Sequence, residues 1–258
     1  MMKNNKFKNL TYKLMLSALT LSPFVIQNTH AAVKNIVLVH GAFADGSSWN
    51  AVSSRLQSLG YHVTSVQNPL TSLDADVEAT KKVLERQKGD VLLVGHSWGG
   101  VVVTKAGNAP NVKGIVYLSA LVPDSNESAS DLLTRLKSPM EGLEPDKNGL
   151  IWLDDAKTFQ HVMANDLPEK QAKLLASVQQ PIAAQAFTQK ISEAAWRVKP
   201  TWYLITTNDN ALKPRTQELI SKQAHSSIIR VNSSHLSLIS QIDQVSKLID
   251  KAAKIFKQ

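Results

Sequence analysis

A serine with the surroundings of a nucleophile lies near the middle of the chain. The pentapeptide Gly95–Gly99 reads GHSWG, directly follows the apolar run Asp90–Gly95 and precedes a stretch of helical spacing. A serine on such a sharp strand-to-helix turn adopts strained backbone angles that small neighbours permit, and its hydroxyl then stands clear of the sheet. The first N–H groups of the following helix point at the same place. Ser97 is therefore the predicted nucleophile.

A serine nucleophile needs a base to remove its proton and an acid to orient that base. Among seven histidines, His235 lies just past the last strand run, at the carboxyl edge of the sheet where Ser97 also emerges. Asp209 directly follows the run Thr201–Thr207 and is the predicted acid, with Asp124 as the alternative. The chain order serine, aspartate, histidine is a known order for this triad.

The segment VHGAF, which ends at Phe43, follows the first strand run. Acyl transfer develops negative charge on the carbonyl oxygen of the substrate, and preorganised N–H donors must meet it. The backbone N–H groups of Ala42 and Trp98 are the predicted pair. We expect the Phe43 ring either to face the substrate or to pack beneath a covering segment.

These residues need a sheet to position them, and short β-rich runs do alternate with segments of helical spacing. The strand runs are Val33–His40, Tyr61–Val66, Asp90–Gly95, Val112–Ala120, Thr201–Thr207 and His225–Val231. The helical segments are Ser48–Leu59, Leu73–Gln87, Trp98–Lys105, Arg215–Ala224 and Leu236–Lys254. Apolar strands separated by helices predict an α/β fold whose mostly parallel sheet is covered on both faces.

One stretch departs from this alternation. Between about residues 124 and 190, after the fourth strand run, no strand is convincing, and amphipathic pieces predict a helical cap over one edge of the sheet. These pieces are Ser128–Leu136, Asp154–Ala164 and Pro168–Val178. The apolar residues of the cap are candidates for a substrate pocket and equally for packing between cap and core: Trp152, Phe159, Met163 and Phe187.

The first 31 residues are typical of a secretory signal peptide. Four lysines precede the apolar stretch Leu14–Ile26, and small residues surround a cleavage point after Ala31. The stretch is shorter than the roughly 20 residues that span a bilayer, so an integral membrane protein is not expected. We expect a periplasmic or secreted protein whose mature domain is residues 32–258.

The net charge of +8 shrinks with this segment, because its four lysines are matched by no acid, and 25 basic against 21 acidic residues leave +4. No basic run interleaved with aromatic residues remains, so nucleic-acid binding is not expected. The absence of cysteine excludes disulfides and Cys-ligated metals. With 43% hydrophobic residues, the chain can form one substantial core.

Several motifs together resemble the α/β-hydrolase superfamily over essentially the whole mature chain. They are HGAFADGSSW from His40, GHSWGG from Gly95, Pro123-Asp124, Thr207-Asn208-Asp209 and Ser234-His235. The sequence looks most like the small cofactor-free serine esterases related to plant methylesterases and hydroxynitrile lyase-like hydrolases. The resemblance implies an α/β-hydrolase fold, a Ser-His-Asp esterase, water as the second substrate, and no cofactor or metal.

Three positions limit what can be transferred from relatives. Asn210 stands where relatives often carry an arginine after the acid, so the loop lacks that salt bridge. Leu236 stands where hydroxynitrile lyases carry a lysine, which argues against cyanohydrin cleavage. Ser97 excludes the haloalkane dehalogenase and epoxide hydrolase branches, because they use an aspartate nucleophile.

The sequence therefore predicts a hydrolase of carboxylic esters whose small to medium substrates are largely apolar. An amidase, lactonase, acyltransferase or perhydrolase would use the same triad, and a non-catalytic ligand-binding member of the fold is a further alternative.

The signal-peptide interpretation makes a direct prediction. When the full chain is expressed in an exporting host, the mass of the intact exported protein should correspond to a chain that begins at Ala32. Exported protein that retains residues 1–31 would show that this segment is not a cleaved signal peptide.

Overall fold

The computed structural model describes residues 33–140 and 142–256. The signal peptide predicted for residues 1–31 lies outside the described residues and stays a prediction. No helix of the described part is long and apolar enough to cross a membrane.

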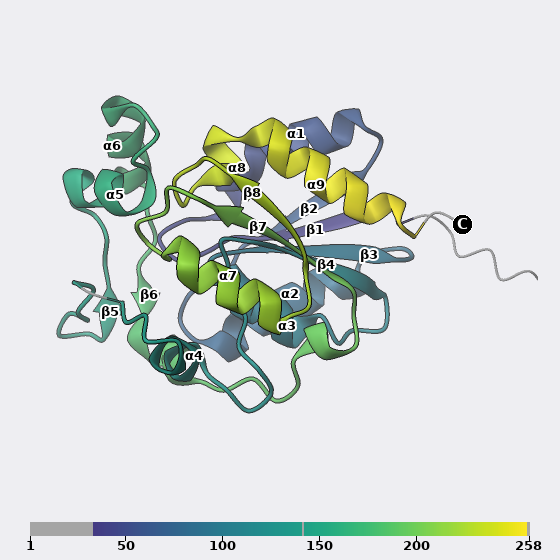
Figure 1. The fold of residues 1–258 in the computed structure, drawn as a ribbon, viewed down its shortest axis with the longest axis horizontal. Helices are drawn as coiled ribbons and strands as arrows, with labels where there is room; N and C mark the ends of the chain where they lie inside the picture. The colour runs from purple at the N-terminus through teal and green to yellow at the C-terminus, as the bar shows by residue number, and fades with distance from the viewer. Residues whose placement is uncertain (1–32, 141, 257–258) are drawn as a thin grey trace, which may run out of the picture.

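A sheet of six parallel strands forms the centre of the protein (Figure 1). Its strand order is β2-β1-β3-β4-β7-β8. The strands are β1 (Asn35–Val39), β2 (His62–Val66), β3 (Val91–His96), β4 (Val112–Leu118), β7 (Thr201–Thr206) and β8 (Ser227–Val231). Every residue of β1, β3 and β7 is buried, whereas the edge strands β2 and β8 are mostly exposed or half-buried. This pattern confirms the predicted α/β fold with a parallel sheet, because only strands covered on both faces can be apolar throughout.

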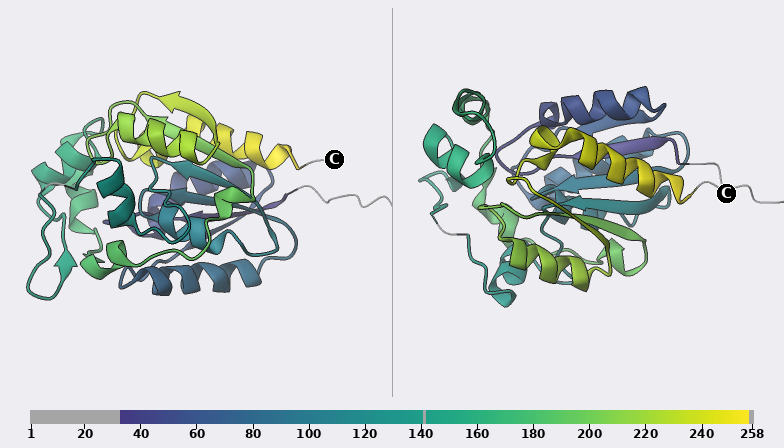
Figure 2. Two further views of the ribbon diagram at one scale, coloured as in Figure 1. Left: turned by 60° about the horizontal axis from the view of Figure 1, so that its bottom comes forward. Right: turned by 45° about the horizontal axis from the view of Figure 1, so that its top comes forward.

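Helices cover both faces of the sheet (Figures 1 and 2). On one face α1 (Asn50–Ser58) packs against α9 (Ile242–Lys254), and on the other α2 (Leu73–Glu85) packs against α3 (Gly99–Ala106). The face of α2 and α3 also carries α7 (Pro214–Gln223) (Figure 1). A one-turn helix, α8 (Ser237–Ser240), precedes α9, and the 3₁₀ turn η1 (Gly46–Trp49) precedes α1.

The predicted C-terminal helix Leu236–Lys254 is interrupted. Gln241 has a non-helical backbone (φ −130°, ψ 45°), and it separates α8 from α9. The short helix stays with the loop of His235, because the Leu236 N–H donates to the Met163 carbonyl. The longer helix turns away to pack against α1.

The cap helices of the segment between β4 and β7 lie at one end of the sheet, away from the C-terminal end of α9 (Figures 1 and 2). This segment contains α4 (Ala129–Arg135), α5 (Ala156–Met163) and α6 (Glu169–Ser177), which match the three predicted helical pieces. The 3₁₀ turns η2 (Ala184–Thr188) and η3 (Ala195–Arg197) follow.

The expectation that this segment contains no strand was wrong. The two-residue strands β5 (Leu150–Ile151) and β6 (Ile182–Ala183) pair antiparallel. Two residues are too few to give a periodic pattern, and the pairing joins positions 31 and 33 residues apart.

Candidate active site

Ser97 occupies a strained turn between β3 and α3. Its φ is +53°, a left-handed conformation that costs a residue with a side chain roughly 1–2 kcal/mol. Ser97 is partly exposed, whereas its neighbours His96 and Trp98 are buried. The backbone of Ser97 donates to the Leu118 carbonyl (3.1 Å) and accepts from the Leu121 N–H (3.1 Å). The sequence motif therefore folds into the turn that it predicts.

Glycine is required next to this turn for space. A Cβ at Gly99 would lie 2.5 Å from the Val39 carbonyl oxygen, and a Cβ at Gly41 would lie 2.8 Å from the Ser97 Cβ. The elbow and the segment after β1 therefore approach each other closely only because these two positions carry no side chain.

His235 and Asp209 form a buried pair. His235 Nδ1–H donates to Asp209 Oδ2 at 2.7 Å, and the two residues are 2% and 3% exposed. Asp124, the alternative acid, instead accepts from Arg197 Nε at 2.7 Å, and this hydrogen bond lowers the pKa of Asp124. The structure thus brings His235 together with Asp209 and commits Asp124 to a surface ion pair.

Asp209 is held by more donors than His235 alone. Its Oδ2 also accepts from Thr206 Oγ1 (2.7 Å) and Gln217 Nε2 (2.9 Å), and its Oδ1 accepts from the N–H groups of Ala211 and Leu212. Burial alone would raise the pKa of Asp209, but the nearby His235 and these donors hold it below its usual value. Asp209 is therefore ionised at neutral pH.

His96 attaches the histidine loop to the elbow. Its Nε2–H donates to the His235 carbonyl at 2.9 Å, and the two ring centroids are 4.8 Å apart. Burial and the neighbouring His235 lower the pKa of His96 to about 3, so its ring is neutral.

Among the described hydrogen bonds none joins the Ser97 hydroxyl to His235, and catalytic hydrogen bonds often shorten only when substrate binds.

His40 fixes the segment that carries Ala42. Its Nδ1–H donates to the Gly41 carbonyl (2.8 Å), and its Nε2 accepts from the Asn68 N–H (2.9 Å). Burial lowers the pKa of His40, so this neutral tautomer is maintained. Ala42 is 5% exposed, and Phe43 follows it with a strained φ of +58°.

Helix α5 and the loop after it contact the loops that carry Asp209 and His235. Asp166 Oδ2 accepts from the Ser234 N–H at 3.0 Å. Asn210 Nδ2 donates to the His161 carbonyl at 2.8 Å. Asn210 therefore anchors its loop by an amide hydrogen bond, in place of the salt bridge that an arginine would make.

The predicted pocket residues separate in the structure. Phe43 and Phe159 line a cavity of about 280 Å³, which Leu175, Leu236 and Leu238 also line.

The other three lie elsewhere. Phe187 packs its ring 4.9 Å from that of Trp98, and Met163 is buried in the core. Trp152 is 42% exposed, and its indole donates to Asp146.

The described residues contain no cluster of three or more His, Asp or Glu side chains that could hold a metal ion.

Comparison with known proteins identifies the family. Residues 36–248 match the model of the alpha/beta hydrolase family, so the chain belongs to this family. It is 28% identical over 242 residues to the alpha/beta hydrolase nvfD of Aspergillus novofumigatus, covering 84% of this chain and 96% of that one. It is 30% identical over 123 residues to methylesterase 1 of Arabidopsis thaliana, covering 42% and 47%.

The solved structure of polyneuridine aldehyde esterase has the same fold, with a TM-score of 0.74 at 18% identity over 86% of this chain and 99% of that one. These relatives confirm the predicted α/β-hydrolase fold and its methylesterase-like branch. The protein is a carboxylesterase-like hydrolase.

Gln217 was not predicted, because a glutamine inside a helix carries no motif. Its replacement by leucine should remove a donor from Asp209 and leave the Thr206 N–H, which donates to Gln217 Oε1, without an acceptor. We expect a loss of about 1–3 kcal/mol in the free energy of unfolding in urea. We also expect a roughly tenfold fall in kcat on p-nitrophenyl butyrate.

Gln223→Leu on the same helix is the control, because Gln223 bonds Arg135 and Val122 rather than Asp209. Equal effects of the two substitutions on kcat would contradict a role of Gln217 in holding the acid.

Proposed function

We propose that this protein hydrolyses carboxylic esters through Ser97, His235 and Asp209. The observation that carries the proposal is the buried His235–Asp209 pair, attached through His96 to the strained turn of a partly exposed serine. A buried histidine with an ionised carboxylate on Nδ1 has its Nε2 free to accept a proton. Strained backbone conformations of this kind cluster at active sites, which supports a functional role for Ser97.

The reaction follows from these roles. Ser97 Oγ attacks the ester carbonyl carbon while its proton passes to His235 Nε2, and a tetrahedral oxyanion forms. His235 then returns the proton to the leaving alcohol, which departs and leaves an acyl group on Ser97. Water attacks this acyl-enzyme with His235 again as base, the carboxylic acid leaves, and Ser97 regains its proton.

The oxyanion is the species that most needs stabilisation in this scheme. The N–H groups of Ala42 and Trp98 are the proposed donors, since Trp98 directly follows the nucleophile and Ala42 lies in the segment that contacts it through Gly41. His40 supports this role because it bonds the Gly41 carbonyl and so holds the Ala42 N–H in position.

The charge on Asp209 supports the same scheme. An ionised carboxylate beside His235 stabilises the imidazolium that forms when the base takes the proton of Ser97. The four additional donors around Asp209 keep it ionised and fix its orientation.

The cavity of about 280 Å³ supports a small to medium, largely apolar substrate. Ser97 and His235 do not line it, but Phe43 and Leu236, which directly follow Ala42 and His235 in the chain, do. Phe159 and Leu175 of the cap and Leu238 of α8 make it mainly apolar. We propose that it receives one apolar arm of the ester.

Hydrolysis of p-nitrophenyl esters, from acetate to decanoate, tests the proposed activity. Wild type should release p-nitrophenol, and Ser97→Ala should lower kcat by at least about 10³-fold because the nucleophile is lost. Circular dichroism should show the same fold in both. Equal turnover by folded wild type and Ser97→Ala would contradict the proposal, as would no turnover of any ester by the wild type.

The position of the cavity can be tested with a matched pair on α6. Leu175→Trp should fill the cavity and raise KM for p-nitrophenyl hexanoate about fivefold or more, on the order of 1 kcal/mol, and leave acetate nearly unchanged. Leu174→Trp is the control, because Leu174 is 63% exposed and does not line this cavity. The same KM change in both variants, or no KM change in Leu175→Trp, would show that the substrate does not occupy this cavity.

A further inference from the structure

A buried carboxylate outside the proposed triad lies next to the elbow. Asp76 is fully buried on the first turn of α2. Its Oδ2 accepts from the indole Nε1–H of Trp98 at 2.7 Å, and its Oδ1 accepts from the Leu70 N–H at 2.8 Å. No described Lys, Arg or His side chain forms an ion pair with Asp76.

Such a carboxylate is costly to bury. Without a cation, the lost hydration of the charge is replaced only by two neutral N–H donors. Burial raises the pKa of Asp76 to about 6, against the lowering effect of these two hydrogen bonds. An apolar side chain of the same size would avoid this cost. Unlike an apolar side chain, Asp76 accepts hydrogen bonds from the Trp98 indole and from the Leu70 N–H.

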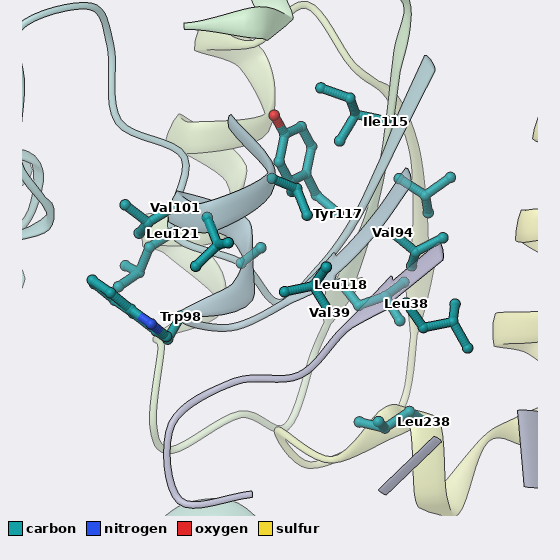
Figure 3. Packing of buried hydrophobic residues seen from close by; sticks show 14 of the residues in the cluster. Leu38, Val39, Val94, Trp98, Val101, Ile115, Tyr117, Leu118, Leu121 and Leu238 are labelled. Atoms are coloured by element: carbon teal, nitrogen blue, oxygen red, sulfur yellow. The ribbon is translucent and has the colours of Figure 1, made fainter. Parts of the chain in front are cut away.

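One of the two N–H groups belongs to Trp98, the residue directly after Ser97. The Trp98 side chain is 1% exposed and belongs to the same buried hydrophobic cluster as Val101 and Leu121 (Figure 3). Its ring also packs against Phe187 of the cap. These contacts are apolar and permit small sliding movements, whereas the hydrogen bond to Asp76 fixes one point of the ring.

The indole and the backbone N–H of Trp98 are joined through the Cα of this residue, directly before α3, so an anchored indole limits how far that Cα can move. A donor aimed at a developing oxyanion is effective only within a narrow range of position. A fixed indole therefore restricts the direction of the Trp98 N–H.

We propose that Asp76 is a positioning residue that holds Trp98 through its indole, so that the Trp98 backbone N–H is aimed at the oxyanion. This inference rests on the proposed ester hydrolysis. The competing explanation is that Asp76 is needed only for its second hydrogen bond, which it accepts from the Leu70 N–H. Leu70 has a strained φ of +57°, and its carbonyl accepts from the Ala183 N–H of β6, so Asp76 also stabilises the turn that meets the cap.

A double-mutant cycle separates the two roles. Asp76→Leu removes both acceptors, whereas Trp98→Phe removes the indole donor together with part of the buried ring and leaves the Leu70 bond in place. If Asp76 acts through Trp98, each single change lowers kcat on p-nitrophenyl butyrate about 10- to 100-fold with KM within about twofold. In the Trp98→Phe background, Asp76→Leu should then lower kcat by less than a further twofold.

An inhibitor supplies the readout that a loss of stability would not give. A trifluoromethyl ketone adds to the serine and places an oxyanion between the same donors. Its Ki should rise in each single variant by the same factor as kcat falls, because both depend on aiming at the oxyanion. Asp74→Leu is the matched control on the same turn, since Asp74 is exposed and pairs with Lys105, and it should change kcat less than twofold.

Each outcome decides the question. If Asp76→Leu lowers kcat equally in the wild-type and Trp98→Phe backgrounds, or if it changes KM rather than kcat, the proposal is overturned. Asp76 would then act by stabilising the Leu70 turn. If Asp76→Leu does not fold, Trp98→Phe alone decides, and unchanged kcat and Ki in that variant would overturn the proposal. A wild type without esterase activity would contradict the proposed function itself, whereas an active wild type with additive losses contradicts only the role of Asp76.

Discussion

The site depends on the left-handed backbone of Ser97, which the surrounding structure must enforce. A non-glycine residue at φ +53° persists only when its neighbours determine its position. Strand β3 lies between β1 and β4 in the buried middle of the sheet, and the Leu118 and Leu121 backbones of the β4 side bond to Ser97. Gly99 lies so close to the Val39 and His40 carbonyl oxygens that no side chain fits at this position.

The remaining parts of the site are attached to this turn by neutral, buried hydrogen bonds. His96 binds the His235 loop, His40 holds the segment of Ala42, and both rings are kept uncharged by burial. Charge is concentrated at Asp209, where five donors, that of His235 included, surround one carboxylate. A site built in this way can stabilise one new positive charge on His235 and one new negative charge on the substrate.

The sequence was sufficient where the signal was local or periodic. The strand runs and the GHSWG turn predicted the sheet and the serine, and the positions of Asp209 and His235 after strands predicted the pair that the structure contains. It was not sufficient where partners are distant. Gln217 and Asp76 bond to the site across helices, and nothing in their neighbourhoods along the chain marks them.

The central claim is that Ser97 is a nucleophile activated by its surroundings, and covalent trapping tests it most directly. Wild type treated with a p-nitrophenyl alkylphosphonate should gain the mass of one phosphonyl group, and peptide mapping should place it on Ser97. Ser97→Ala should gain none, and His235→Ala should react far more slowly because the proton of Ser97 has no acceptor. Folded wild-type protein that stays unmodified, or that is labelled at another residue, would contradict the account.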